Sequence, residues 1–375
     1  MNTVGLNETL SIGQRTFYFE TDYLDEEKRI VACAYEGGML LVTETKPARE
    51  GISEYERQQD VKDFHREIVR SFERLFYIQR KVWMKKHAPS YNKLGAVFLK
   101  KNLFDDAIRN FQEALAIDDN LSEARRNLAV AFIKSQRFDE ALGALDRALR
   151  ENAHFPDLLN LKGMALLGKK NFMDSIQAFE QALRENENYG LAHLNLGLAY
   201  LTSLVEAKIH PQLRPPEERK RKCLKHLAQA KSVLSESQRR ELTHVLEEIE
   251  NAETSEALDN LLEIHKEVAF PLNGILEHEF YLNYMFGGQN KDELAIERYI
   301  EGLKAEIAEH PRYPDLHNHL GVAYLIQCRN LFLRALDEFR RAIRLNPHFA
   351  RAQKNLKLAE NEGKGLLILL RALLK

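Results

Sequence analysis

The sequence predicts a mostly α-helical protein, an α-solenoid in which helix pairs stack side by side. Two observations lead to this fold class. A pattern of small and aromatic residues recurs every 34 residues through the middle of the chain, and a fixed period of about 20–50 residues indicates a repeat architecture. Helix breakers are also scarce, with 10 Pro and 18 Gly in 375 residues, which fits helices joined by short turns.

The recurring pattern is anchored on small residues at positions 95, 129, 163 and 197. A large apolar residue follows each anchor three positions later, on the same face of a first helix. In the first copy, Ala107, Phe111 and Ala114 then have the spacing of one stripe on a second helix. Small residues let the two backbones cross closely, and the large ones fill the space between them. The anchors with their apolar followers are Gly95 and Phe98, Ala129 and Phe132, Gly163 and Leu166, and Gly197 and Tyr200.

These offsets resemble the tetratricopeptide repeat family, whose helix pair has 34 residues. The resemblance covers residues 88–204 and 312–357. It implies four repeats over residues 88–237, the fourth with an insertion near 205–216, and a further repeat over 312–349. In that last copy Gly321 is the anchor, and a two-residue insertion moves the following alanine to Ala335. Residues 238–311 are expected to be a divergent helical segment, and residues 350–375 a capping helix that covers the open end of the stack.

The N-terminal part differs from the repeats. Residues 1–50 are predicted to form an antiparallel β-meander of three strands that are rich in β-branched and aromatic residues, with Glu36-Gly37-Gly38 as a hairpin turn. A long amphipathic helix is expected over residues 51–87. Its apolar stripe has nearly heptad spacing, so self-association of this unit into a homo-oligomer is a hypothesis. The stripe consists of Val61, Phe64, Ile68, Phe72, Leu75, Ile78 and Val82.

Motifs of catalysis or cofactor binding are missing from the sequence. It contains no phosphate loop, no GxGxxG, no GxSxG elbow and no HExxH. His317 and His319 are two residues apart, so on a helix they point to different faces. We therefore expect a protein that is not an enzyme and that needs neither metal nor cofactor.

The family resemblance implies that the first helix of each pair lines a concave groove. Asparagine side chains there can bond the backbone of an extended peptide. Leu191, Leu194, Leu198 and Leu201 form an apolar strip suited to an amphipathic segment, unless they pack beneath the insertion at 205–216. The residues expected to face a partner are Asn92, Arg126, Asn127, Val130, Asn160, Met164, Leu194, Asn195, Leu198 and Asn318.

The leading functional hypothesis is a scaffold or adaptor that binds a segment of another protein in this groove. The alternative is a regulatory protein that senses a ligand or binds nucleic acid through the basic residues 219–226. Nucleic acid is not the expected partner, because 54 Lys plus Arg against 56 Asp plus Glu leave no basic excess.

A cytoplasmic location is expected from two features. Three widely separated cysteines indicate a reducing compartment, and residues 1–17 lack a basic stretch followed by an apolar run. The most apolar segment, Gly365–Leu374, is too short to span a membrane.

Overall fold

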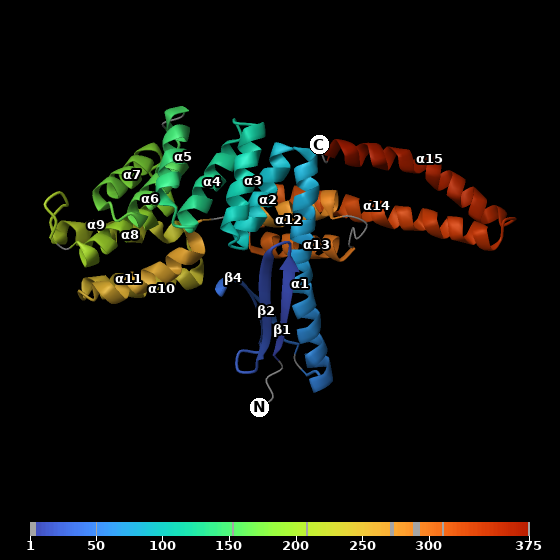
Figure 1. Ribbon diagram of the computed structural model, residues 1–375, viewed down its shortest axis with the longest axis horizontal. Coiled ribbons are helices and arrows are strands. Elements are labelled where there is room, and N and C mark those ends of the chain that lie inside the picture. Colours follow the sequence, from blue (N-terminus) through green and yellow to red (C-terminus); the bar gives the residue numbers. More distant parts are fainter. Residues whose placement is uncertain are drawn as a thin grey trace. The chain divides into compact units, whose positions relative to one another are not determined.

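The computed structural model describes residues 5–49, 51–151, 154–207, 209–270, 274–287, 293–309 and 311–373. The chain divides into two compact units, Met1–Ile275 and Leu276–Lys375. The first unit holds a small sheet, a long helix and the repeats (Figure 1). The second unit is helical throughout its described secondary structure.

The N-terminal sheet has four antiparallel strands in the order β1-β2-β3-β4. The expected meander is present, with Gly37 and Gly38 at φ 57° and 81° in the turn between β3 and β4, as a tight hairpin requires. The sequence predicted three strands and missed the first. That strand is a mostly exposed edge without clear alternation, and its pairing with β2 from Leu6↔Thr21 to Ile12↔Arg15 defines it. The strands are β1 (Leu6–Ile12), β2 (Arg15–Leu24), β3 (Arg29–Glu36) and β4 (Met39–Pro47).

Helix α1 (Glu54–Lys85) begins at a capping box formed by Ser53 and Glu56 and packs on one face of the sheet (Figure 1). The Phe72 ring lies 5.1 Å from that of Phe19, and the Phe76 ring lies 5.4 Å from that of Phe98 on the next helix. Every residue of the predicted apolar stripe is at most 7% exposed. The chain's own sheet and helices therefore bury this stripe, and self-association of the N-terminal unit stays a hypothesis that this packing does not test.

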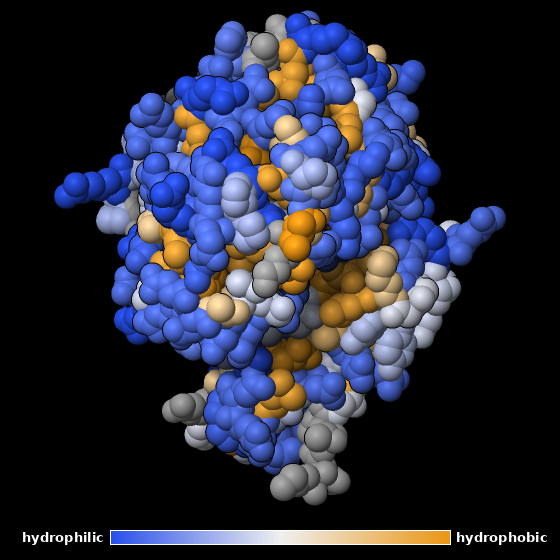
Figure 2. All heavy atoms as spheres, turned by 90° about the vertical axis from the view of Figure 1, so that its left-hand side faces the viewer, coloured by the Kyte–Doolittle hydropathy of each residue, from blue (hydrophilic) through white to orange (hydrophobic). Residues whose placement is uncertain are grey.

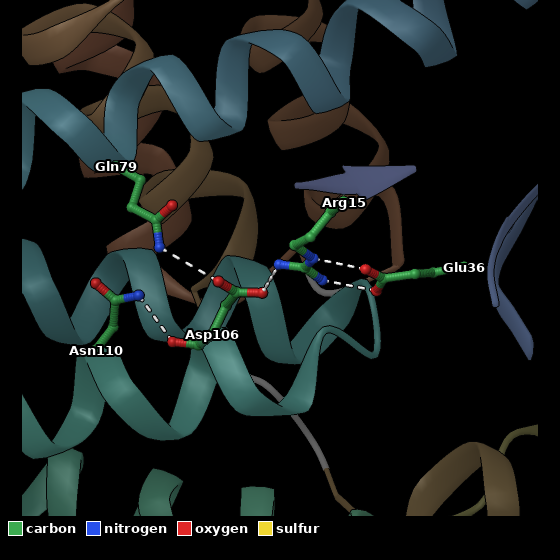
Figure 3. A network of polar contacts seen from close by, with 5 residues as sticks. All are labelled: Arg15, Glu36, Gln79, Asp106 and Asn110. Atoms are coloured by element: carbon green, nitrogen blue, oxygen red, sulfur yellow. Dashed lines mark hydrogen bonds and ion pairs between the residues drawn. The ribbon is translucent and has the colours of Figure 1, made fainter. Parts of the chain in front are cut away.

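Polar contacts fasten the sheet to the first repeat (Figure 3). The guanidinium of Arg15 on β2 donates to both carboxylate oxygens of Glu36, at 2.5 and 2.7 Å, and also to Asp106 of the first repeat. Gln79 of α1 donates to the same Asp106 carboxylate at 3.4 Å. The two acidic partners raise the pKa of Arg15, so the charged form is strongly favoured at this junction.

Eight helices follow in the repeat region, and each packs against the next (Figure 1). The turns after the first helix of three pairs are alike. Asn102, Gln136 and Lys170 have φ values of 53°, 60° and 60° and follow one another at the 34-residue period. The helices are α2 (Ala88–Lys100), α3 (Phe104–Ile117), α4 (Ser122–Lys134), α5 (Phe138–Glu151), α6 (Pro156–Gly168), α7 (Phe172–Glu185), α8 (Gly190–Glu206) and α9 (Pro216–Gln229).

The small anchor residues lie where paired helices cross. A Cβ added to Gly95 would come within 2.6 Å of the Phe111 ring, and one added to Gly163 within 2.5 Å of the Phe179 ring. No side chain larger than hydrogen fits at these positions unless the ring moves. The register of small and aromatic residues read from the sequence is confirmed for these pairs.

Three further elements close the first unit. They are the short helix η1 (Ala230–Val233), α10 (Glu236–Glu250) and α11 (Thr254–Val268). Helix α10 begins at a second capping box, formed by Ser235 and Gln238. Helix α11 packs against α10 after a short turn and also packs against α8, which brings the chain back to the last repeat.

The second unit contains α12 (Ile275–Phe286), α13 (Glu293–Glu309), α14 (Pro314–Leu345) and α15 (Ala350–Leu373). Its core joins Ile300 and Leu303 of α13 to Ala323 and Ile326 of α14. The helix pair expected over residues 312–349 is a single helix of 32 residues instead. Two residues are inserted between Gly321 and Ala335 relative to the other repeats, and the segment from Ile326 to Ala335 continues as helix.

Candidate functional site

The first helices of neighbouring repeats are joined by pairs of asparagines. Asn127 Nδ2 on α4 donates to Asn92 Oδ1 on α2 at 3.2 Å. Asn195 Nδ2 on α8 donates to Asn160 Oδ1 on α6 at 2.9 Å. These four side chains are at most 4% exposed. Their amides therefore satisfy one another inside the stack, as buried polar groups must.

Most of the residues predicted to face a partner share this burial. Each is at most 8% exposed, so substitution there would test packing rather than direct partner contact. Arg126 is half-buried, whereas Asn318 is exposed on α14 in the second unit. The buried members are Asn92, Asn127, Val130, Asn160, Met164, Leu194, Asn195 and Leu198.

The chain's own helix α11 packs against α8, the helix that carries the predicted apolar strip. Leu194, Leu198 and Leu201 are at most 3% exposed. The apolar face of α11, which includes Leu261 and Ile264, is buried as well. The sequence offered a partner segment or the 205–216 insertion as the cover for this strip. The structure places an amphipathic helix of the same chain against α8.

A buried hydrogen bond joins α11 to the asparagine pairs. His265 Nε2 lies 2.8 Å from Asn195 Oδ1. Because the Asn195 amide nitrogen already donates to Asn160, its oxygen is the acceptor, so His265 donates from Nε2 and leaves Nδ1 unprotonated. Burial lowers the pKa of His265 to about 4, so this histidine is neutral near pH 7.

A pocket of about 540 Å³ remains open between the beginnings of α4 and α6. Arg126 and Asp157 face each other there at 4.0 Å, with side chains 26% and 54% exposed. Phe155 at the pocket wall is 45% exposed. Burial and the neighbouring Asp157 raise the pKa of the Tyr189 hydroxyl. The lining residues are Asn120, Ser122, Glu123, Arg125, Arg126, Ala148, Phe155, Asp157 and Leu158.

Only Arg126 of the predicted partner-facing residues lines this pocket. The rest of the lining comes mostly from the turns that precede the first helices and from the starts of those helices, and none of these residues was among those predicted to face a partner. Phe155-Pro156-Asp157-Leu158 was visible as a helix start, because Pro suits the first turn and Asp suits the helix N-terminus. Nothing in that motif alone indicated that Phe155 would be left exposed beside Arg126.

Some side chains of the basic segment at 219–226 are used inside the fold, whereas Arg221 and Lys225 are exposed. Arg219 is 1% exposed and donates to the backbone oxygens of Ser203 and Ala207 at 2.6 and 3.1 Å, which satisfies carbonyls at the end of α8. Lys222 lies 3.5 Å from a Glu180 carboxylate oxygen. These contacts weigh against a phosphate-binding patch at this segment.

The ring of His226 stacks against that of His193 at 5.2 Å between centroids. Their Nδ1 atoms lie 3.0 Å apart. Burial, the neighbouring histidine and nearby lysines lower the pKa of His226 to about 4. The pair is thus neutral near pH 7 and adds no positive charge to the basic segment.

Metal-binding and membrane-crossing features are absent from the part of the chain that the structure describes. Within it, no three or more His, Cys, Asp or Glu side chains gather closely enough to hold a metal ion. No helix there has a stretch long and apolar enough to cross a bilayer.

Cys223 is buried, and burial raises the pKa of its thiol to about 12, which makes it a poor nucleophile. The face seen in Figure 2 is mostly hydrophilic, with hydrophobic residues in narrow patches.

Comparisons with known proteins agree with the repeat geometry. Two family models, both described as tetratricopeptide repeat, match residues 98–165 and 160–203. The central part of the chain is thus made of tetratricopeptide-type helix pairs, and such repeats generally serve protein interaction. A search of curated proteins found no match.

Several solved structures are similar to parts of the chain. A crystal structure of MamA is 20% identical, with a TM-score of 0.35, and covers 41% of this chain and 85% of its own. The pilF protein of Pseudomonas aeruginosa is 16% identical, with a TM-score of 0.36, and covers 62% and 96%. A thermophilic TPR protein of Thermus thermophilus is 18% identical, with a TM-score of 0.34, and covers 58% and 98%.

Proposed function

We propose that this protein is a non-enzymatic scaffold that holds a segment of a partner protein in the pocket between α4 and α6. The proposal rests on the composition of this pocket. The pocket is the place on the repeats where an exposed aromatic side chain, Phe155, and a half-buried cation, Arg126, stand beside an opening of about 540 Å³. Binding pockets combine apolar surface with polar and charged groups that orient the ligand, and this pocket has both, with Phe155 and Leu158 among six polar or charged residues.

The lining suggests the chemistry of the bound segment. Phe155 and Leu158 offer apolar surface, so an apolar side chain of the partner would pack there. Arg125 and Arg126 both have carboxylate neighbours, Asp119 at 3.1 Å and Asp157 at 4.0 Å. An acidic group of the partner could replace the longer of these contacts, at Arg126, and gain a charge-assisted hydrogen bond.

We further propose that the protein works in the cytoplasm as an adaptor. The support is that all three cysteines are free thiols in a chain without CxxC pairs, as is usual in a reducing compartment. The role of adaptor follows from having a binding surface and no recognisable catalytic motif in the sequence.

Co-purification from native lysate, with mass spectrometry, tests the proposal. The wild type is compared with a Phe155→Ala/Arg126→Glu variant. Met173→Ala/Arg66→Glu is the matched control, because Met173 is 37% exposed on α7 and Arg66 lies exposed on α1, both outside the pocket lining. We expect a partner that is retained by wild type and control and lost from the pocket variant. Equal retention by all three proteins, each verified as folded, would overturn the assignment of the pocket.

A further inference from the structure

Helix α14 carries the residue pattern of a helix pair but is continuous. In the repeats whose two helices pack on each other, here called the closed repeats, the residue seven positions after the anchor lies in the turn that follows the first helix. Asn102, Gln136 and Lys170 all have positive φ there. The corresponding residue after Gly321 is Cys328, which lies inside the continuous helix. The chain therefore does not turn back at the place where the other repeats do.

The small residues of this last pattern consequently lack their usual neighbours. At Gly95 and Gly163 an aromatic ring stands within 2.6 Å of an added Cβ, whereas at Gly321 nothing lies within 4 Å. Ala107 in the first repeat is 0% exposed, but its counterpart Ala335 is exposed. The small residues Gly321 and Ala335 would allow another helix to cross closely at these positions, but no helix covers them in the structure.

Each half of α14 nevertheless keeps its outer contact. The first half packs on α13, where Ala323 and Ile326 are both 0% exposed. Helix α15 packs against α14, and Arg340 of the second half donates to Glu360 of α15 at 3.1 Å. What is missing is the contact between the two halves themselves. The residues on this side of α14 are here called the open face. They are Gly321, Tyr324, Cys328, Leu331 and Ala335, which are exposed, and Ala342, which is half-buried.

The open face has the spacing of a helix-pairing seam. Its successive members are 3, 4, 3, 4 and 7 residues apart, which is a heptad pattern with one position, Glu338, passed over. The six residues are uncharged, whereas Glu338, at the remaining position of the same spacing, is an exposed carboxylate that lies 3.9 Å from Arg341. Tyr324 and Leu331 are 43% and 55% exposed, so a stripe of this length remains in water, as is common for a surface that binds another molecule.

The register of the closed repeats indicates which residue would pack against Gly321. There the anchor glycine contacts the aromatic residue of the second helix, as Gly163 contacts Phe179. In α14 the equivalent pair is Gly321 and Phe339. These residues lie on one continuous helix about 27 Å apart, so they cannot meet within one chain. A second α14 running antiparallel, with its midpoint at residue 330, would place Gly321 of each copy opposite Phe339 of the other.

We propose that α14 pairs with α14 of a second copy of this chain, so that each copy supplies the second helix that completes the last repeat of the other. Both copies contribute the same face of α14 to the interface. The pair is therefore two-fold symmetric, and no further copy can be added through this face. The proposal goes beyond the pocket between α4 and α6, because it involves neither its residues nor its partner.

Light scattering after size exclusion tests the pairing on the full chain. We expect twice the monomer mass of 43.4 kDa for the wild type. Leu331→Asp should return the protein to the monomer mass by placing a charge in the seam. Leu358→Asp on α15 should leave the dimer intact, since Leu358 has a similar exposure of 51% outside the open face. A wild type that is monomeric at every concentration, up to about millimolar, would overturn the proposal.

Engineered cysteines separate pairing between copies from closure within one chain. Tyr324 and Ala335 lie near each other in the proposed register, because their midpoint is also close to residue 330. A Tyr324→Cys/Ala335→Cys protein that also carries Cys328→Ser is oxidised mildly and run under denaturing, non-reducing conditions. A disulfide-linked dimer is the expected product. A disulfide confined to the monomer would mean that α14 folds back on itself, and this would overturn the proposal.

Discussion

Acidification should loosen the contact between α11 and α8 through His265. The pKa of this side chain falls from 6.5 to about 4 because of burial. The folded protein then binds fewer protons than the unfolded chain between these two pH values. Stability that is fully present above about pH 6.5 is therefore lost as the pH falls toward 4. The pKa difference of about 2.5 corresponds to a loss of at most about 3 kcal/mol, at about 1.36 kcal/mol per unit.

The assay is urea unfolding followed by circular dichroism, at about pH 7.5 and about pH 4.5, for the wild type and His265→Gln. Glutamine retains an N–H that can donate to Asn195 Oδ1 but does not titrate. Other groups, including His226, titrate in both proteins. The free energy of unfolding that the wild type loses between the two pH values, minus the loss in His265→Gln, therefore reports on His265. We expect the wild type to lose about 2–3 kcal/mol more than the variant. Equal losses would refute the buried, neutral histidine.

Two further substitutions test the packing of the repeats. Ala114→Phe should overpack the crossing of α2 and α3, where Ala114 is 0% exposed, and lower the free energy of unfolding by roughly 1–3 kcal/mol; an unchanged urea midpoint would contradict the register. Arg219→Met should cost about 1.5–3 kcal/mol by removing charged hydrogen bonds to carbonyls at the end of α8. The same variant should leave any weak binding to RNA unchanged in a filter-binding assay, and a clear loss of binding would revive a nucleic-acid role for the basic segment.

The repeats could be predicted from the sequence because their determinants are local. The anchor Gly95 and its ring Phe111 are 16 residues apart, and the same pair recurs as Gly163 and Phe179. Helical periodicity and a fixed turn length are enough to bring such residues together. The hairpin at Gly37-Gly38 was predictable for the same reason, since the turn itself demands glycine.

The candidate site was harder to predict because long-range packing decides which groove residues stay exposed. Asn195 has the features of a peptide-binding asparagine, but His265, 70 residues later, takes up its oxygen. The leucines of α8 were identified as an apolar strip, yet their cover is a helix whose place no local signal gives. Strand β1 was missed because pairing with β2, rather than its own composition, makes it a strand.

The repeat pattern also failed to predict that α14 is one continuous helix rather than a helix pair. Its residues keep the anchor and the following aromatic of a repeat, with two residues inserted before Ala335, but a turn also needs a residue that adopts positive φ. The segment around Cys328 continues as helix because the residues there, such as Arg329 and Leu331, are good helix formers.

Site-specific photo-crosslinking in living cells tests directly whether the pocket between α4 and α6 binds a partner protein. A photoreactive amino acid replaces Leu158 in the pocket in one protein and Met173 on α7 in another. We expect light to link a discrete partner protein to position 158 and not to position 173, and we expect Arg126→Glu in the first protein to abolish the link. Partner adducts at position 173 with none at 158 would contradict a binding site between α4 and α6.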